Sequence, residues 1–239
     1  MAWQALIDKM INRHQAFDQQ IAAILQRAQQ NQLQIYCREG CASCCTLAVN
    51  CSFPEAMQIA QQLDAPRRAV LQNKVALLQS VAQEATDFKH FLRLFRQQIK
   101  GCPFLDSATQ SCTVYAARPM CCRAMLSTRP NSWCGVAFAD LHPLEKKIFI
   151  DSLDPDVVAF PTHYLAESQE LGSYSEASIL SDMHDVFEMN LGGNLIYLVW
   201  LELEFRLSAL IAQNPESAIE LLQRENEIYP FLLQFRRSK

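Results

Sequence analysis

The stretch at residues 37–45 reads CREGCASCC and places four thiols within nine residues, with the spacing C-x3-C-x2-C-C. A buried free cysteine behaves as a small hydrophobe that can stand anywhere in a core, so packing alone does not explain this density. Four thiols in so short a stretch need a chemical reason. The stretch therefore indicates either metal ligation or disulfide bonding.

A second cysteine-rich stretch runs from Cys102 to Cys134 and contains five more cysteines, so nine of the ten lie in two stretches. The tenth, Cys51, lies just beyond the first stretch. The chain begins without a basic region, apolar run and cleavage site of a secretory signal, so we expect a cytoplasmic location. In a reducing compartment clustered cysteines are metal ligands or catalytic thiols more often than disulfides. A disulfide-stapled secreted protein is the weakest interpretation.

Soft thiolates select zinc, cuprous copper or the iron of iron–sulfur clusters. The neighbours Cys44 and Cys45 point in different directions, and such a pair rarely binds one tetrahedral ion. This pair favours a multinuclear centre, or two sites that share the stretch. A closed zinc site uses four ligands, so eight thiols would serve two zinc ions or a larger centre. We expect an iron–sulfur cluster in preference to zinc, and the Cys102-Pro103 dipeptide is a weak further indication because Cys-Pro also closes bacterial ferredoxin motifs.

The composition is that of a globular protein, with 50% hydrophobic and 19% charged residues in a chain of 239. The net charge of -4 argues against nucleic acid as the main partner. The most apolar segment, Leu195 to Leu203, is interrupted by Glu202 and is too short to span a bilayer. We therefore expect no membrane span. A protein partner that binds the helical surface stays an open alternative.

Apolar residues recur at helical spacing along most of the chain, which predicts a mainly α fold with an irregular cysteine-rich segment. Residues 1–36 should form an amphipathic helix, residues 37–134 the metal-chelating region, and residues 135–239 the C-terminal helical part of the same domain. Ser52 and Glu55 have the spacing of a capping box, which predicts a helix start there. Further helices are expected at 67–99, 144–153, 179–189 and 195–211, with Gly192-Gly193 opening a helix and a last helix beginning near Asn214.

Several motifs together resemble a known family. They are the stretch at residues 37–45, the sequence CPFLD at 102–106, Cys112 followed by Val114-Tyr115, and the sequence RPMCCR at 118–123. The region from 37 to 134 is identified as a member of the CxxCxxCC family, described as a zinc- or iron-chelating domain. This chain departs from the family pattern in having x3 where x2 is usual between the first two cysteines.

The resemblance implies metal chelation by eight cysteines: Cys37, Cys41, Cys44, Cys45, Cys102, Cys112, Cys122 and Cys134. One branch of the family is similar to flagellin lysine methylases, so the resemblance leaves a protein-modifying activity open. Gly192-Gly193 lacks the pattern of a Gly-rich nucleotide loop, and no activity follows from the residues themselves.

The remaining candidates have simpler interpretations. Arg118 and Arg123 could offset thiolate charge through hydrogen bonds to sulfur. Cys51 and Cys121 fall outside the family positions and are expected to be spare buried thiols. We expect His14 to be a structural or surface histidine. The other histidines are expected to be satisfied by local contacts: His90, His142, His163 and His184. Two functions stay open, a metalloprotein with redox or modifying chemistry and a structural zinc module that binds a protein partner.

Overall fold

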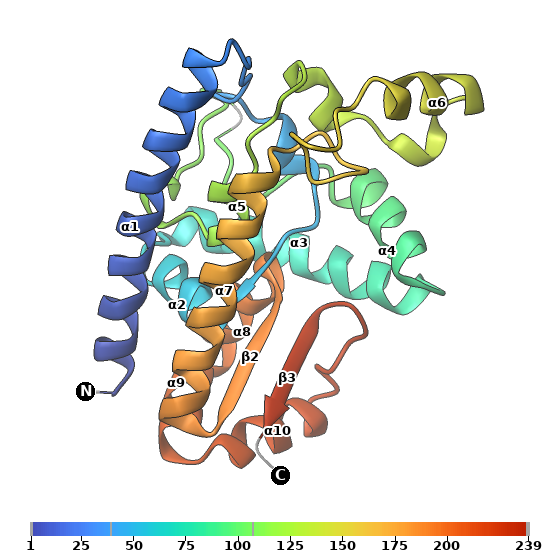
Figure 1. Ribbon diagram of the computed structural model, residues 1–239. Helices are drawn as coiled ribbons and strands as arrows, with labels where there is room; N and C mark the ends of the chain where they lie inside the picture. Colours follow the sequence, from blue (N-terminus) through green and yellow to red (C-terminus); the bar gives the residue numbers. More distant parts are fainter. Residues whose placement is uncertain (1, 39, 107, 238–239) are drawn as a thin grey trace.

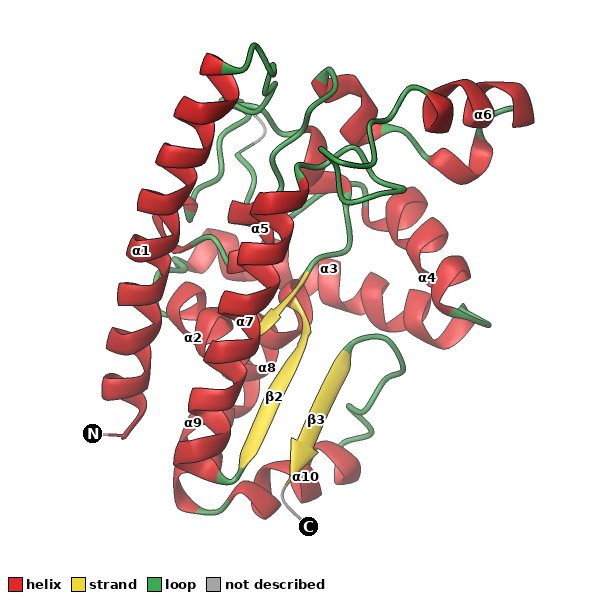
Figure 2. Cartoon of the chain, in the orientation of Figure 1, coloured by secondary structure: helices red, strands yellow, loops and turns green. Residues whose placement is uncertain are grey.

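The computed structural model describes residues 2–38, 40–106 and 108–237. The fold is mainly helical, as the sequence predicts, and it also contains a three-stranded antiparallel sheet that the sequence pattern did not reveal (Figures 1 and 2). One cluster of buried side chains draws members from all three predicted regions, including Met10, Phe53 and Tyr197. The two cysteine-rich stretches lie at one end of this core, among the loops drawn in the upper half of Figure 1.

The N-terminal helix α1 (Ala2–Gln30) runs along one side of the molecule (Figure 1). Its apolar stripe is buried against α2 (Phe53–Ala60) and α7 (Ala166–Phe187). The predicted amphipathic helix is therefore confirmed. His14 lies on this stripe and is buried, so the helix also carries a polar group into the core.

The segment expected to be one helix over 67–99 is broken. It forms α3 (Ala65–Glu84), α4 (Phe88–Leu94) and the π-helical turn η2 (Phe95–Ile99). Ala85 is extended and the Asp87 side chain accepts a hydrogen bond from the His90 N–H, which starts a new helix. Apolar spacing continues across the break and therefore does not reveal it.

Helix α7 begins at Ala166, thirteen residues before the expected start at 179. Its first half packs against α5 (Met120–Ala124) through small residues, and a Cβ at Gly172 would lie 2.5 Å from the Ala124 Cβ. Ser168 is fully buried there and donates a hydrogen bond to the Ala124 carbonyl. Small residues at a contact of this kind leave no hydrophobic period in the sequence.

The sheet joins β1 (Asn50–Ser52), β2 (Met189–Asn194) and β3 (Leu233–Arg237), with β2 in the middle. Gly192 and Gly193 lie in β2, so the expectation that they open a helix is wrong. Gly193 has a φ of 155°, and a Cβ there would collide with the Leu232 carbonyl of the chain beside it. The pair of glycines thus permits a close backbone approach.

The strongly apolar helix α8 (Leu195–Phe205) follows β2 directly and is buried against α2 and α3. The expected helix at 195–211 is interrupted because Arg206 adopts a left-handed conformation, after which α9 (Leu207–Gln213) begins. The last helix, α10 (Pro215–Arg224), starts at its Asn214 cap as predicted.

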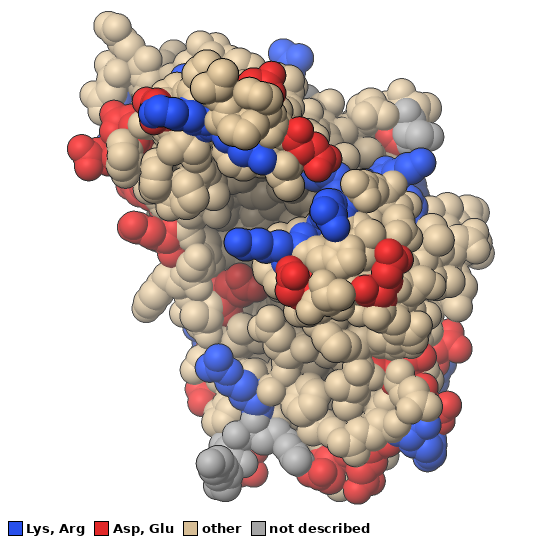
Figure 3. All heavy atoms as spheres, turned by 90° about the vertical axis from the view of Figure 1, so that its right-hand side faces the viewer, with Lys and Arg blue, Asp and Glu red and all other residues tan. Residues whose placement is uncertain are grey.

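The short helix α6 (Pro143–Asp151) projects from the upper part of the molecule (Figure 1). The face turned to the viewer in Figure 3 is hollowed below its upper part, and Lys and Arg side chains stand at the edge of the hollow. None of the helices in the described ranges has the length and apolar character needed to cross a membrane.

Candidate metal centre

All eight cysteines at the family positions line one cavity of about 300 Å³. The other two, Cys51 and Cys121, do not line it. The two cysteine-rich stretches are therefore adjacent in space, as the sequence predicts, although residues 46–101 separate them along the chain. The lining cysteines are Cys37, Cys41, Cys44, Cys45, Cys102, Cys112, Cys122 and Cys134.

Two of the four thiols of the first stretch lie on a tight turn, η1 (Ser43–Thr46). The Cys45 N–H donates to the Ala42 carbonyl at 2.9 Å, and the Leu47 N–H donates to the Cys44 carbonyl at 3.0 Å. Both Cys44 and Cys45 lie on this turn and both line the cavity. The adjacent pair that looked incompatible with a single ion thus borders one shared space.

Backbone hydrogen bonds bring the second stretch to this turn. The Cys102 N–H donates to the Cys45 carbonyl at 2.8 Å, and an isolated bridge pairs Leu105 with Cys112. Cys122 lies on α5, and Cys134 lies on the turn η4 (Asn131–Gly135), which packs against η1. Three separate short elements therefore close the cavity around the first stretch.

Burial and mutual charge keep most of these thiols protonated in the protein alone. Burial raises the pKa of Cys37 to about 11. A hydrogen bond from the Ser127 N–H opposes this rise, and the nearby thiols of Cys134, Cys44 and Cys41 add to it. Burial is also the largest cause of the raised pKa values of Cys102, Cys112 and Cys134, and nearby thiols add to it. Several thiolates can therefore coexist here only when a cation neutralises them.

Cys41 differs from the others. Burial would raise the pKa of its thiol, but hydrogen bonds from the Ser43 N–H and the Asn131 side chain, with the Arg38 charge, outweigh burial and lower it. The Asn131 Nδ2 lies 3.4 Å from the Cys41 Sγ. Cys41 is thus better prepared to ionise than Cys37, Cys102, Cys112 or Cys134, whose pKa values are raised.

The chemistry of this donor set fits a thiolate-ligated metal centre. All ten cysteines carry free thiols, and sulfur donors suit zinc and iron–sulfur iron. Within residues 2–38, 40–106 and 108–237, no three His, Cys, Asp or Glu side chains converge as closely as the ligands of a metal ion do. The thiols surround a common space.

Residues distant in the sequence hold the sulfur atoms by hydrogen bonds. The Ser127 N–H donates to the Cys37 Sγ at 3.1 Å, and the His163 Nε2 lies 3.3 Å from the Cys134 Sγ. The sequence drew attention to His163 only as a histidine satisfied by local contacts, and gave no signal for Ser127 or Asn131. Such partners become visible only when the chain has folded.

Charged groups stand at the cavity wall. Arg118 lies 3.5 Å from the centre of the Tyr115 ring, and its charge partly offsets the rise that burial causes in the pKa of Cys112. Arg123 instead donates to the Arg118 carbonyl at 2.7 Å, to the Ala116 carbonyl, and to Asp18 at 2.5 Å. Arg118 thus acts on a thiol electrostatically, while Arg123 fixes the turn that leads to α5.

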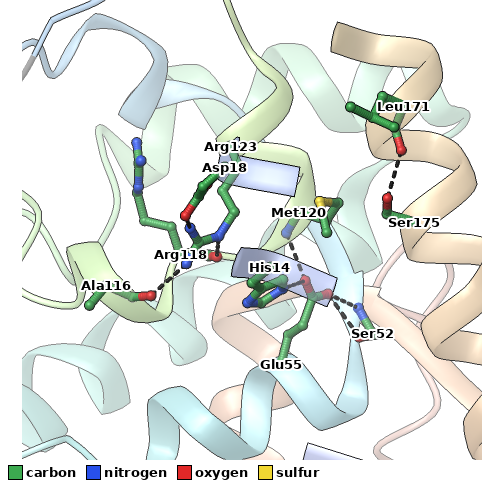
Figure 4. A network of polar contacts seen from close by, with 10 residues as sticks. All are labelled: His14, Asp18, Ser52, Glu55, Ala116, Arg118, Met120, Arg123, Leu171 and Ser175. Atoms are coloured by element: carbon green, nitrogen blue, oxygen red, sulfur yellow. Dashed lines mark hydrogen bonds and ion pairs between the residues drawn. The ribbon is translucent and has the colours of Figure 1, made fainter. Parts of the chain in front are cut away.

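A buried polar network has the Glu55 carboxylate at its centre (Figure 4). Its oxygens accept hydrogen bonds from the His14 Nε2 at 2.9 Å, the Met120 N–H at 2.7 Å, and both the N–H and hydroxyl of Ser52. Burial opposes ionisation, but the hydrogen bond and charge of His14 and the two N–H groups lower the pKa of Glu55. An ionised Glu55 therefore ties α1, α2 and the start of α5 together.

A second acidic group, Glu176 on α7, is affected by this network. Burial and the charge of Glu55 raise the pKa of Glu176 to about 7. A carboxyl group with a raised folded-state pKa binds its proton more tightly in the folded protein, so its contribution to stability is lost as pH rises from its unfolded value through 7. We expect Glu176→Gln to increase the free energy of unfolding near pH 8 by on the order of 2 kcal/mol.

The same substitution should change stability little near pH 5, where Glu176 is neutral. Urea unfolding at the two pH values measures this difference, with Glu170→Gln on the exposed side of the same helix as the control. Equal effects of Glu176→Gln at both pH values would contradict the prediction.

An open groove of about 960 Å³ adjoins the cavity. Cys41, Cys45 and Cys102 line both spaces, and Arg67 and Lys74 of α3 line the groove alone. The side of the cavity formed by these three cysteines therefore borders a groove that is open to solvent.

Comparison with protein families gives a match over the cysteine-rich region. Residues 36–140 match the model of the CxxCxxCC family, whose description reads "Putative zinc- or iron-chelating domain". This is the family that the cysteine motifs predict, and the match covers all eight cysteines that line the cavity. No curated protein and no solved structure matched the chain.

Proposed function

We propose that the eight cysteines of the cavity bind a thiolate-ligated metal centre, and that this centre is an iron–sulfur cluster. The match of residues 36–140 to the model of the CxxCxxCC family, described as a zinc- or iron-chelating domain, supports the proposal. The observation that carries the proposal is which of the cysteines line the cavity. Of ten in the chain, the eight at family positions line the cavity and the two outside those positions do not.

The number of thiols argues against a single zinc ion as the occupant of the cavity. A structural zinc site is closed by four ligands, so one zinc ion would leave four of these thiols unused. Two zinc ions could use all eight, and they are the alternative occupant. When bound, an iron–sulfur cluster supplies one-electron transfer at a potential set by hydrogen bonds to its sulfur atoms and by its exposure to solvent.

The protein's own groups prepare the site for an anionic, sulfur-rich centre. Hydrogen bonds lower the pKa of Cys41, and the raised pKa values of thiols such as Cys102 mean that loading releases protons. The Ser127 N–H and the Asn131 side chain donate to sulfur, which supports thiolates in the cavity. The adjoining groove gives a substrate or redox partner a route to Cys41, Cys45 and Cys102, which favours redox or modifying chemistry at the centre.

A second candidate function is a structural zinc module that binds another protein. Exposed apolar side chains on and beside α6 favour it, with Leu144 64% exposed and Ile148 69% exposed. Phe138 and Phe160 lie in the flanking segments and are also exposed. In this alternative the metal would only hold the cysteine-rich segment in place.

Anaerobic purification followed by elemental analysis separates the two functions. We expect brown protein that contains iron and acid-labile sulfide, because eight thiols in one cavity suit a multinuclear centre. Exposure to air should bleach the colour, since iron–sulfur clusters are redox centres. Colourless protein that carries zinc and no sulfide would refute the iron–sulfur assignment and make the structural zinc module the leading function.

A further inference from the structure

Asn194 stands where β2 ends and α8 begins, is 0% exposed, and lines the cavity with the eight cysteines. Its Oδ1 accepts hydrogen bonds from the N–H groups of Ile196 at 3.1 Å and Tyr197 at 3.4 Å. Both partners are donors, so the oxygen must face them and the orientation of the amide is fixed. The nitrogen of the amide is therefore turned away from the helix end.

That nitrogen, Nδ2, has no hydrogen-bond partner among the described residues, and it is buried. Leaving a buried donor unsatisfied is energetically costly, and native proteins rarely keep such a group without a reason. The other buried side-chain atom of this kind within the described ranges, Gln58 Oε1, belongs to a half-buried residue that does not line the cavity. Of these two residues, Asn194 is the one that lines the cysteine cavity.

The surrounding helix end favours negative charge. Helix α8 has 11 residues, and Leu195 and Ile196 in its first turn line the cavity. The positive end of its dipole stabilises anions there. The Leu195 N–H is already bonded to the Val49 carbonyl at 2.9 Å, and the next two N–H groups are capped by Asn194. The Asn194 side chain is therefore the donor that this helix end offers to the cavity.

We infer that Asn194 donates a hydrogen bond through Nδ2 to a sulfur atom of the metal centre, either a cysteine thiolate or an inorganic sulfide. The inference rests on the proposed function. Asn194 is then a positioning residue that withdraws electron density from sulfur. Hydrogen bonds to sulfur set the reduction potential of iron–sulfur centres, and outer hydrogen bonds also strengthen metal binding.

Two substitutions isolate the donor from the helix cap. Asn194→Ser keeps a good capping oxygen and removes Nδ2, while Asn194→Asp keeps the cap and replaces the donor with an acceptor. The matched control is Asn214→Ser, because the Asn214 Oδ1 caps α10 at 3.0 Å from the Glu216 N–H and the residue does not line the cavity.

Affinity is measured by competition of zinc alone against a chelator, and the potential by redox titration after anaerobic reconstitution with iron and sulfide. We expect Asn194→Ser to weaken zinc binding by about 10- to 100-fold, and Asn194→Asp to weaken it further. Both should move the midpoint potential to more negative values. Asn214→Ser should change neither quantity.

The outcomes separate the inference from the proposed function. Metal-binding wild-type protein with unchanged affinity and potential in both Asn194 variants would overturn the inference alone. Wild-type protein that binds neither zinc nor iron and sulfide would overturn both. If the variants fail to fold, the side-chain amide protons of Asn194 in zinc-loaded wild-type protein decide: NMR signals that shift and exchange more slowly than in zinc-free protein support the inference, and unchanged signals overturn it.

Discussion

Replacement of Glu55 by Ala should lower the free energy of unfolding by about 3–5 kcal/mol, the range found when one partner of a buried ion pair is removed. Glu55 is 0% exposed and its carboxylate accepts four hydrogen bonds, from His14, Met120 and twice from Ser52. The substitution leaves these donors buried without their acceptor and also opens a cavity. Urea unfolding of the metal-free protein measures the loss.

The matched control is Glu167→Ala, which removes a carboxylate paired with Arg27 at the surface. The Glu167 side chain is 56% exposed, and exposed pairs contribute about 0–1 kcal/mol. If Glu55→Ala cost no more than Glu167→Ala, the buried network would not be a main source of stability.

This network also connects stability to the candidate metal centre. The Met120 N–H donates a hydrogen bond to Glu55, and Met120 is the first residue of α5. Cys122 lies two residues further along that helix. His14 reaches the same carboxylate from α1. Glu55 therefore helps to set where a cysteine of the second stretch stands relative to the first, even though its own side chain does not line the cavity.

The sequence predicted the capping role of Glu55 correctly but did not predict its burial. The spacing from Ser52 to Glu55 identifies a capping box, and the capping box is present. A capping Glu ordinarily stands at the surface, and nothing local indicates that α1 and α5 cover this one. Its burial depends on segments some forty residues before it and sixty-five residues after it, which a local motif cannot specify.

The predicted helix boundaries were wrong where the spacing of apolar residues was ambiguous. Helical spacing of apolar residues continues through Ala85 and through Arg206, although the backbone leaves the helix at both positions. Strand β2 was missed because its pairing with β1 and β3 joins segments far apart in the chain. The convergence of the cysteines, in contrast, could be predicted because their short spacings are those of metal-ligand motifs.

The hydrogen-bond partners of the sulfur atoms lay beyond sequence reasoning for the same reason. Ser127 is 90 residues from Cys37, and Asn131 is 90 residues from Cys41. Asn194 is a polar residue between a Gly pair and an apolar helix, where it looks only like a cap. Its unsatisfied Nδ2 becomes informative once the fold brings it to the cysteine cavity.

Single Ser substitutions of the cysteines should give the largest change in metal content. We expect Cys41→Ser, Cys44→Ser, Cys102→Ser and Cys122→Ser each to lose most of the bound metal, because each removes a soft sulfur donor from the cavity. The loss of affinity should exceed the roughly 10- to 100-fold that removal of an outer hydrogen bond typically costs. Metal content per chain after anaerobic purification measures it.

The chain supplies close controls for this experiment. Cys121 directly precedes Cys122 on α5 but does not line the cavity, and Cys51 is 1% exposed in the core beside it. Because burial raises the pKa of Cys51 well above its ordinary value and no described cation lowers it, this thiol stays a neutral packing group. Cys51→Ser and Cys121→Ser should therefore keep their metal while losing some stability. Equal metal loss in all six variants would show that the cavity does not select the ligands.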